Sequence, residues 1–135
     1  MMQKISHVSL LVADQQEALD WYTQKLGWVV KSNDPFPGEP ENRWITVAPA
    51  GQTEMEVVLQ PPDWGPGGNE EERRSQIGKA PGSVLVTDDC RGDCEAMAAK
   101  GVNVIDQPKE LPWGISALFV DLYGYVHNLL QPFEG

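Results

Sequence analysis

The same structural pattern occurs twice in this chain, and the repeat constrains the fold more than any single residue does. The first copy begins with ISHVSLLVADQQEALDWYTQKLGWVV at residues 5–30, and the second with PGSVLVTDDCRGDCEAMAAKGVNVI at residues 81–105. Both predict a strand, an acidic helix start, a helix, a glycine and a second strand. Both copies also close on an apolar run that ends in Leu-Gln-Pro, at residues 59–61 and 130–132. Repetition on this scale indicates an architecture of two similar modules.

The first module, residues 4–61, is expected to have the order β-α-β-β-β. Asp14 and Glu17 have capping-box spacing ahead of the helix, and Gly27 suits a left-handed end to it. The segment at residues 33–42 is rich in Pro, Gly and Asn, so it is expected to form a loop. The strands are expected at residues 5–12, 28–31, 43–48 and 54–60.

The second module, residues 82–133, repeats this order after a linker at residues 62–81. Asp89 is expected to cap its helix and Gly101 to end it. The linker starts with Pro and Gly, and its NEEERR segment favours a short solvated helix with an i,i+4 pair between Glu70 and Arg74. The strands of this module are expected at residues 83–87, 102–105, 114–121 and 126–131.

This order of elements predicts an α+β fold, with one domain at residues 1–135. A single βαβββ unit has an open, curved sheet with one unfilled face, and such a unit is marginally stable alone. We therefore expect the two modules to pair, with their helices outside and their mixed sheets curved around a central cavity. That cavity is left for a ligand.

Composition excludes several kinds of partner. A net charge of −10 offers no basic stripe for nucleic acid or for an anionic membrane surface. No apolar run approaches the roughly 20 residues of a membrane span. The first residues carry no signal-peptide core, so a cytoplasmic location is expected. Cys90 and Cys94 lie one helical turn apart without a second Cys/His pair, which favours reduced, structural thiols over a zinc or redox site.

Four segments of the chain resemble the vicinal oxygen chelate superfamily, which includes glyoxalase I, extradiol dioxygenases and the bleomycin-resistance proteins. They are HVSLLVADQQEALDWYTQKLGW, EMEVVLQP, VLVTDDCRGDCEAMAAKGV and FVDLYGYVHNLLQ. The last one matches the superfamily's strand-turn-strand motif at Asp121, Gly124 and Gln131, with Leu122 in place of the usual Pro and Tyr125 in place of the usual Asn. The resemblance covers nearly the whole chain and implies a glyoxalase-like fold, which hosts many different chemistries.

Enzymes of this superfamily hold one divalent metal through a ligand from each of four strands. The resemblance assigns His7 and Glu56 to two of these positions. It places Gly82 where a histidine is expected and Asn128 where a glutamate is expected. Glycine offers no side-chain donor, and an amide oxygen is a weaker donor than a carboxylate. The set is incomplete, so a divalent metal cofactor is compatible with the sequence but not favoured.

A direct overlay of the two Leu-Gln-Pro endings places Glu56 over His127 rather than Asn128. His7, Glu56 and His127 would then form the two-histidine, one-carboxylate set of mononuclear iron enzymes. Neighbouring strand residues point to opposite faces of a sheet, so His127 and Asn128 cannot both face the cavity without a bulge. The spacing typical of the superfamily favours Asn128 facing inward, with His127 as the alternative ligand.

The remaining candidate pocket residues are aromatic or cationic. Trp44 lies on a predicted strand that leads to the cavity, and Trp113 lies in a loop. Such residues suit a flat or apolar ligand, although dimer contacts explain them equally well. Arg43 is a candidate anion-binding residue of the pocket. Glu56 either faces solvent or, inside the cavity, pairs with His7 as a hydrogen-bonding group or general base.

Two main functions are consistent with these residues. The first is a glyoxalase/bleomycin-resistance-like protein that binds a small apolar or aromatic molecule in the cavity between the modules, without a complete metal site. The alternative is a metal-dependent lyase, isomerase or dioxygenase that uses His7, Glu56 and either Asn128 or His127. In both, the partner is a small molecule, and an exposed sheet edge favours a homodimer. The sequence is also consistent with a third function, a dimerisation module that binds no ligand.

Overall fold

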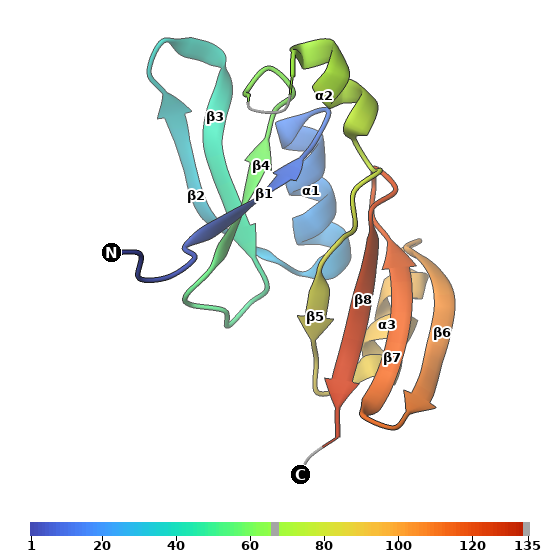
Figure 1. Ribbon diagram of the computed structural model, residues 1–135. Coiled ribbons are helices and arrows are strands. Elements are labelled where there is room, and N and C mark those ends of the chain that lie inside the picture. Colours follow the sequence, from blue (N-terminus) through green and yellow to red (C-terminus); the bar gives the residue numbers. More distant parts are fainter. Residues whose placement is uncertain (66–67, 134–135) are drawn as a thin grey trace. The chain divides into compact units, whose positions relative to one another are not determined.

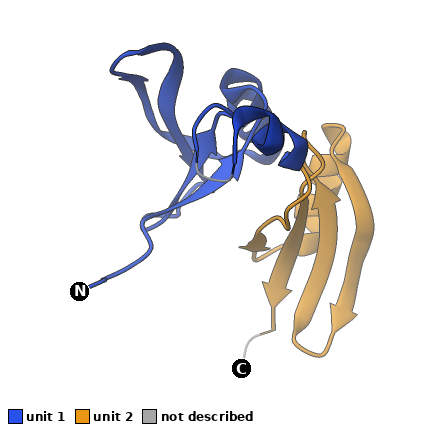
Figure 2. Cartoon of the chain, turned by 45° about the horizontal axis from the view of Figure 1, so that its top comes forward, with its two compact units in different colours: residues 1–77 blue, residues 78–135 orange. Residues whose placement is uncertain are grey.

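The computed structural model describes residues 1–65 and 68–133, and the chain divides into two compact units, Met1–Ile77 and Gly78–Gly135 (Figure 2). Each unit contains one copy of the repeat, and both copies have the predicted order β-α-β-β-β (Figure 1). Each unit has its own mixed four-stranded sheet. The α+β class and the glyoxalase-like pair of modules are therefore confirmed.

Unit 1 has a sheet with the strand order β1-β4-β3-β2, in which β1 and β4 are parallel and the other neighbours are antiparallel. The parallel pair joins the first and last strands of the module, so residues far apart in the sequence become direct neighbours. The elements of this unit are β1 (His7–Leu11), α1 (Gln15–Leu26), β2 (Val29–Phe36), β3 (Glu39–Ala48), β4 (Glu56–Gln60) and α2 (Glu70–Gln76).

Helix α1 begins and ends where the sequence predicts. The Asp14 carboxylate accepts a hydrogen bond from the backbone N–H of Glu17 at 2.9 Å, and Gly27 ends the helix in the left-handed region at φ 71°. The inner face of α1 buries Leu19 and Tyr22, and the Tyr22 ring lies 4.8 Å from that of Trp28. Full burial of a large apolar side chain contributes about 1.5–3 kcal/mol, so this face holds α1 on the sheet.

The hairpin formed by β2 and β3 is longer than the sequence predicts, and the expectation of a loop at residues 33–42 is wrong. The strands continue to Phe36 and resume at Glu39, and Gly38 supplies a positive φ of 80° at the turn. Pro35 is tolerated because β2 is an edge strand, where a missing N–H breaks no ladder. The register shifts beside Pro35, so the prolines mark an irregular hairpin rather than a loop.

Helix α2 confirms the short helix expected in the linker. Asn69 caps it, and Glu70 and Arg74 form the expected i,i+4 ion pair at 3.1 Å. Arg73 departs from the expectation of a fully solvated helix because its side chain is buried and donates hydrogen bonds to the carbonyls of Pro62 and Gly68. The helix is therefore anchored to the segment that follows β4.

Unit 2 has the strand order β5-β8-β7-β6, again with its first and last strands parallel. Asp89 caps its helix by accepting from the backbone N–H of Gly92 at 3.0 Å. The second strand of the unit in sequence order, β6, runs to Leu111, well beyond the predicted end at residue 105, with register shifts on both sides of Asp106. The elements are β5 (Val84–Val86), α3 (Cys90–Ala99), β6 (Asn103–Leu111), β7 (Gly114–Val120) and β8 (Val126–Pro132).

The two cysteines of α3 belong to the core of unit 2. Cys90 and Cys94 are free thiols, and both are buried, together with Phe119 and Leu129 of the sheet. Burial raises the pKa of the Cys94 thiol to about 11 and also raises the pKa of the Cys90 thiol. These are properties of structural cysteines. Within residues 1–65 and 68–133, no helix is long and apolar enough to cross a membrane.

Candidate functional site

His7 and Glu56 lie opposite each other on the parallel strands β1 and β4. They are direct partners in the strand register, and His7 Nε2 lies 3.6 Å from Glu56 Oε1. Their side chains are 36% and 32% exposed, so a ligand can reach both while part of each is shielded from water. The pairing of the first and last strands of the module thus brings together two residues that the sequence singles out.

Thr46 of β3 fixes the carboxylate of Glu56. Its side chain is fully buried, and its hydroxyl donates a hydrogen bond to Glu56 Oε1 at 2.6 Å. Thr46 was not among the candidate residues of the sequence. The available signal was strand alternation, which places Thr46 on the same face as Trp44, two residues earlier.

Two further side chains border His7. The Trp44 ring meets the His7 ring edge to face, with centroids 5.6 Å apart and an interplanar angle of 62°. The Ser6 hydroxyl lies 2.8 Å from His7 Nδ1. We call Ser6, His7, Trp44, Thr46 and Glu56 the His7–Glu56 cluster. It places an imidazole, a carboxylate and a half-buried aromatic surface side by side.

The His7–Glu56 cluster lies on the sheet face opposite to α1. Side chains alternate along β3, and the Arg43 guanidinium donates a hydrogen bond to Gln16 of α1 at 2.6 Å. Arg43 therefore faces α1, as do the fully buried Ile45 and Val47. Trp44 and Thr46 point the other way. Helix α1 covers one face of the sheet, and the cluster belongs to the other.

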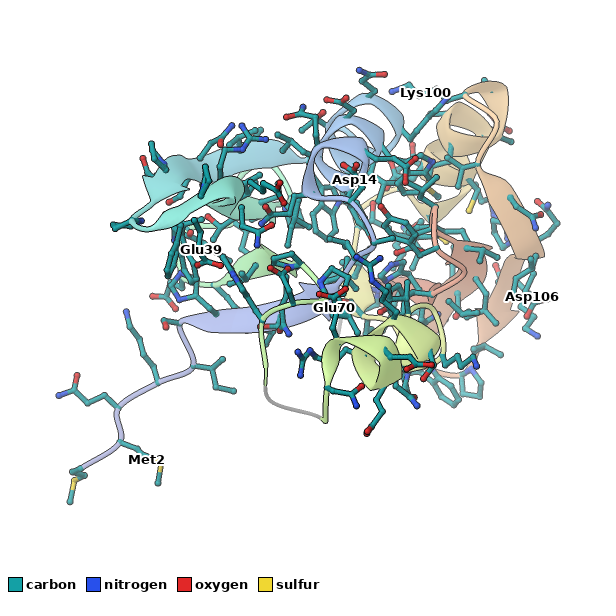
Figure 3. The ribbon with its side chains drawn as sticks, turned by 90° about the horizontal axis from the view of Figure 1, so that it is seen from above. Met2, Asp14, Glu39, Glu70, Lys100 and Asp106 are labelled. Atoms are coloured by element: carbon teal, nitrogen blue, oxygen red, sulfur yellow. The ribbon has the colours of Figure 1, made fainter. Side chains whose placement is uncertain are left out.

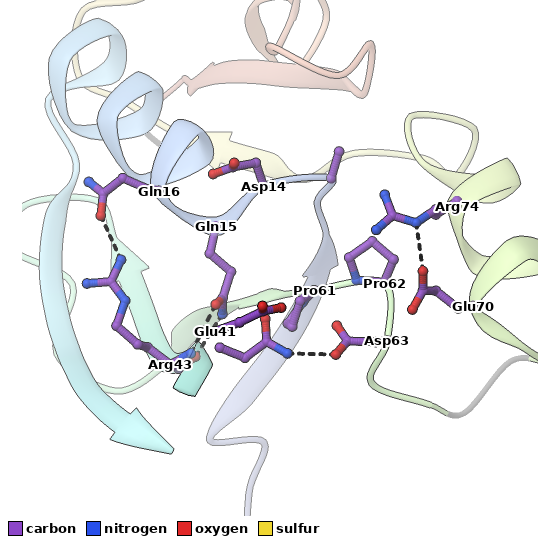
Figure 4. Close-up of a pocket in the computed structure, with 12 residues that line it drawn as sticks. Asp14, Gln15, Gln16, Glu41, Arg43, Pro61, Pro62, Asp63, Glu70 and Arg74 are labelled. Carbon is purple, nitrogen blue, oxygen red and sulfur yellow. Dashed lines mark hydrogen bonds and ion pairs between the residues drawn. The ribbon is translucent and has the colours of Figure 1, made fainter. Parts of the chain in front are cut away.

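Arg43 lines a separate pocket of unit 1, which has a volume of about 470 Å³ (Figure 4). Gln15, at the start of α1, holds the backbone of Arg43 by donating to its carbonyl at 2.7 Å and accepting from its N–H at 3.1 Å. Gln15 also donates to the carbonyl of Leu59 at 2.9 Å. The structure therefore separates Arg43 from His7 and Glu56, with which the sequence grouped it.

This Arg43 pocket is acidic. Asp14 and Glu70 lie at the starts of α1 and α2 (Figure 3), and Arg74 is paired with Glu70 at 3.1 Å. The lining carboxylates are those of Asp14, Glu41, Asp63 and Glu70, whereas the lining cations are Arg43 and Arg74. The excess of carboxylates makes the pocket a poor anion site, so the expectation of an anion bound by Arg43 gains no support from it.

In unit 2, the side chain of Asn128 is engaged with the neighbouring strand. Its Nδ2 donates to Ser116 Oγ at 2.7 Å and to the carbonyl of Ala117 at 3.0 Å, both on β7. The amide nitrogen therefore ties β8 to β7. Trp113, the other candidate of this unit, lies between β6 and β7 and is 61% exposed.

His127 occupies the opposite face of β8 and is 1% exposed. The backbone N–H of Ser83 donates to His127 Nδ1 at 2.9 Å, so the proton of a neutral ring is on Nε2. This Nε2 lies 3.3 Å from Asp121 Oδ2, and the Asp121 side chain is also buried. Both ring nitrogens are thus occupied within unit 2. The structure places His127 in a structural network and not on the face that carries Asn128.

The residues present do not fit the four-ligand metal site that the superfamily resemblance implies. The backbone N–H of Gly82 donates to the Val126 carbonyl at 3.1 Å, and a Cβ at position 82 would lie 2.8 Å from His127 Nδ1. The described residues contain no group of three or more His, Cys, Asp or Glu side chains arranged to hold a metal ion. His7 and Glu56 supply one imidazole and one carboxylate, fewer than the three protein ligands of a catalytic zinc.

Comparison with known proteins gives similarity along both units. Residues 4–128 match the family model of the Glyoxalase/Bleomycin resistance protein/Dioxygenase superfamily. TnmS3, an antibiotic binding protein from Streptomyces sp. CB03234, is 33% identical, with 98% of each chain covered and a TM-score of 0.79. UcmS2 is 32% identical over 96% of this chain and 98% of its own, with a TM-score of 0.83. An uncharacterised protein of Shewanella frigidimarina is 33% identical over 97% of this chain and 95% of its own.

Proposed function

Because the chain belongs to the Glyoxalase/Bleomycin resistance protein/Dioxygenase superfamily, we propose that it binds a small apolar or aromatic molecule at the His7–Glu56 cluster without a complete metal site. The observation that carries this proposal is the position of Trp44 against His7, beside the carboxylate of Glu56. An aromatic wall with a few oriented polar groups is typical of small-molecule sites. The description of TnmS3 as an antibiotic binding protein supports the same class of function.

The alternative, a metal-dependent lyase, isomerase or dioxygenase, needs a Lewis acid held at this place. Two of the positions assigned to ligands by the resemblance are Gly82, packed against β8, and Asn128, whose amide is bonded to β7. These contacts weigh against the alternative, and a metal measurement separates the two functions.

The test combines metal analysis with ligand titration. Protein prepared without a polyhistidine tag is analysed for bound metal and titrated calorimetrically with Zn²⁺, and then with 2-naphthol as an aromatic probe. We expect less than stoichiometric metal and saturable binding of the probe. Stoichiometric metal that disappears in a His7→Ala variant would overturn the proposal and support the enzyme.

A pair of tryptophan variants locates the binding. Trp44→Ala removes the aromatic surface of the cluster, and an aromatic contact of about 0.5–1.5 kcal/mol corresponds to a two- to tenfold loss of affinity. Trp21→Ala serves as the matched control, because Trp21 lies on α1 and its ring contacts Tyr22. Circular dichroism checks that both variants are folded. An equal loss of affinity in both variants would place the binding elsewhere.

A further inference from the structure

The two oxygens of Glu56 have different surroundings. Oε1 accepts the hydrogen bond of Thr46 at 2.6 Å and faces His7 Nε2 at 3.6 Å. Within the described part of the chain, Oε2 makes no hydrogen bond or ion pair. Because the side chain is 32% exposed, this second oxygen is open to an incoming group.

The chemistry of the neighbouring groups determines what Oε2 can bind. A carboxylate oxygen only accepts hydrogen bonds. The polar groups next to it, the Thr46 hydroxyl and the His7 ring nitrogen, both face Oε1. A ligand that contacts Oε2 must therefore bring its own donor, and a ligand carboxylate at this place would be repelled. The net charge of −10 also repels an anionic ligand at longer range.

The aromatic surface of Trp44 contacts the same His7 ring that faces Glu56. Its ring centroid is 5.6 Å from that of His7, which in turn faces Glu56. A flat ligand that packs on Trp44 can thus place a substituent at the carboxylate.

We propose that the ligand of this site is an aromatic molecule whose hydroxyl or ammonium group donates a hydrogen bond to Glu56 Oε2, with Thr46 as the residue that positions the carboxylate. This inference rests on the proposed function. It narrows the ligand class from apolar or aromatic molecules in general to neutral or cationic ones that carry a donor. Anionic aromatics are excluded from the class.

Four naphthalenes of similar shape test this ligand class by calorimetry. 2-Naphthol and 2-naphthylmethylammonium carry a donor, 2-methoxynaphthalene has none, and 2-naphthoate is anionic. We expect the two donors to bind about tenfold or more tightly than 2-methoxynaphthalene, because a hydrogen bond to a charged group is lost with the donor. The naphthoate should bind most weakly of the four.

Three variants separate the roles of Glu56 and Thr46. Glu56→Gln should lower the affinity for 2-naphthylmethylammonium about tenfold and leave that for 2-methoxynaphthalene unchanged. Thr46→Val should weaken the two donor probes selectively, whereas Thr46→Ser, which keeps the hydroxyl, should restore them. Thr53→Val, at an exposed position between β3 and β4, is the matched control and should change nothing.

The outcomes distinguish this inference from the function on which it rests. If no naphthalene binds, both are wrong. If all four bind equally well and Glu56→Gln has no effect, the protein binds aromatics but the donor assignment is overturned. Tightest binding of the naphthoate would also overturn it. If Thr46→Ser weakens the donor probes as much as Thr46→Val does, Thr46 does not act through its hydroxyl.

Discussion

Gly82 is the position where a small change tests the packing of unit 2 most directly. No positive φ is required there, so the need for glycine is a matter of space. A Cβ would lie 2.7 Å from the carbonyl carbon of Val126 and 2.8 Å from His127 Nδ1, and closer still to the Val126 oxygen. Real Cβ atoms essentially never approach other atoms so closely, so Gly82→Ala must push β8 away from the residues that precede β5.

The expected cost follows from the contacts that would be disturbed. Overpacking a tight site costs about 1–3 kcal/mol. The shift also weakens the bond from Gly82 N–H to the Val126 carbonyl at 3.1 Å and the bond from Ser83 N–H to His127 at 2.9 Å. One buried hydrogen bond contributes about 1 kcal/mol. We therefore expect Gly82→Ala to lower the free energy of unfolding by roughly 2–4 kcal/mol.

Urea unfolding followed by circular dichroism measures this loss, and amide exchange of Ser83 reports whether the bond to His127 opens first. Gly65→Ala is the control, because among the described residues its Cβ would meet the Arg73 guanidinium at 3.4 Å, which is an ordinary van der Waals contact. We expect the control to stay within about 0.5 kcal/mol of the wild type. A Gly82→Ala protein as stable as the control, with unchanged exchange at Ser83, would refute the packing argument.

The same clash bears on the metal site. Gly82→His combined with Asn128→Glu restores the four residue types that the superfamily resemblance implies, but the histidine has the same Cβ as alanine. We expect the double variant to bind Zn²⁺ no more tightly than wild type in a calorimetric titration. Asn128→Glu alone is the control for the added histidine, and circular dichroism checks that both variants are folded. Tight stoichiometric zinc in the double variant would contradict this expectation.

Two further predictions concern the helices. Gln15→Leu should lower the free energy of unfolding by about 2–3 kcal/mol in urea, because it removes the partner of the buried Leu59 carbonyl and of the partly buried backbone N–H and carbonyl of Arg43. Equal stability would show that water replaces the amide. The second is a pH effect at Cys94, whose thiol pKa is raised by burial from the ordinary 9.0 to about 11. The unfolded chain loses this proton first, so stability should fall between pH 9 and pH 11 and the fall should be smaller in Cys94→Ala. An identical pH dependence in both proteins would show that the thiol has no part in it.

The order of elements could be predicted because both copies of the repeat show the same sequence pattern. The caps at Asp14 and Asp89 and the glycine at position 27 determine helix boundaries through local bonds alone, and these predictions are confirmed. The hairpin of β2 and β3 could not be predicted, since its pairing depends on a neighbouring strand. Composition alone predicted a loop at residues 33–42. The structure has an edge strand there, and an edge strand can contain Pro35.

The candidate site could be predicted only in part. His7 and Glu56 could be identified from the sequence because the superfamily motif marks both positions. Their contact depends on the parallel pairing of β1 and β4. Thr46 was missed because strand alternation places it on the face of Trp44 but does not identify Glu56, on the neighbouring strand, as its partner. Arg43 was grouped with Trp44 because the two are adjacent in sequence, yet adjacency on a strand places side chains on opposite faces.

The two copies of the repeat use equivalent strand positions for different purposes. In unit 1, β1 and β4 meet at His7 and Glu56, and both side chains remain accessible. In unit 2, the backbone N–H of Gly82 donates a hydrogen bond to the Val126 carbonyl. The His127 ring fills the adjacent space and accepts a hydrogen bond from the backbone N–H of Ser83. A change at the unit 1 positions should therefore alter ligand affinity with little effect on stability, because these groups are partly solvated. A change at the unit 2 positions should do the reverse, because the groups there are buried and bonded to one another. Glu56→Gln and Gly82→Ala, each measured by calorimetry and by urea unfolding, should thus differ in which of the two quantities changes.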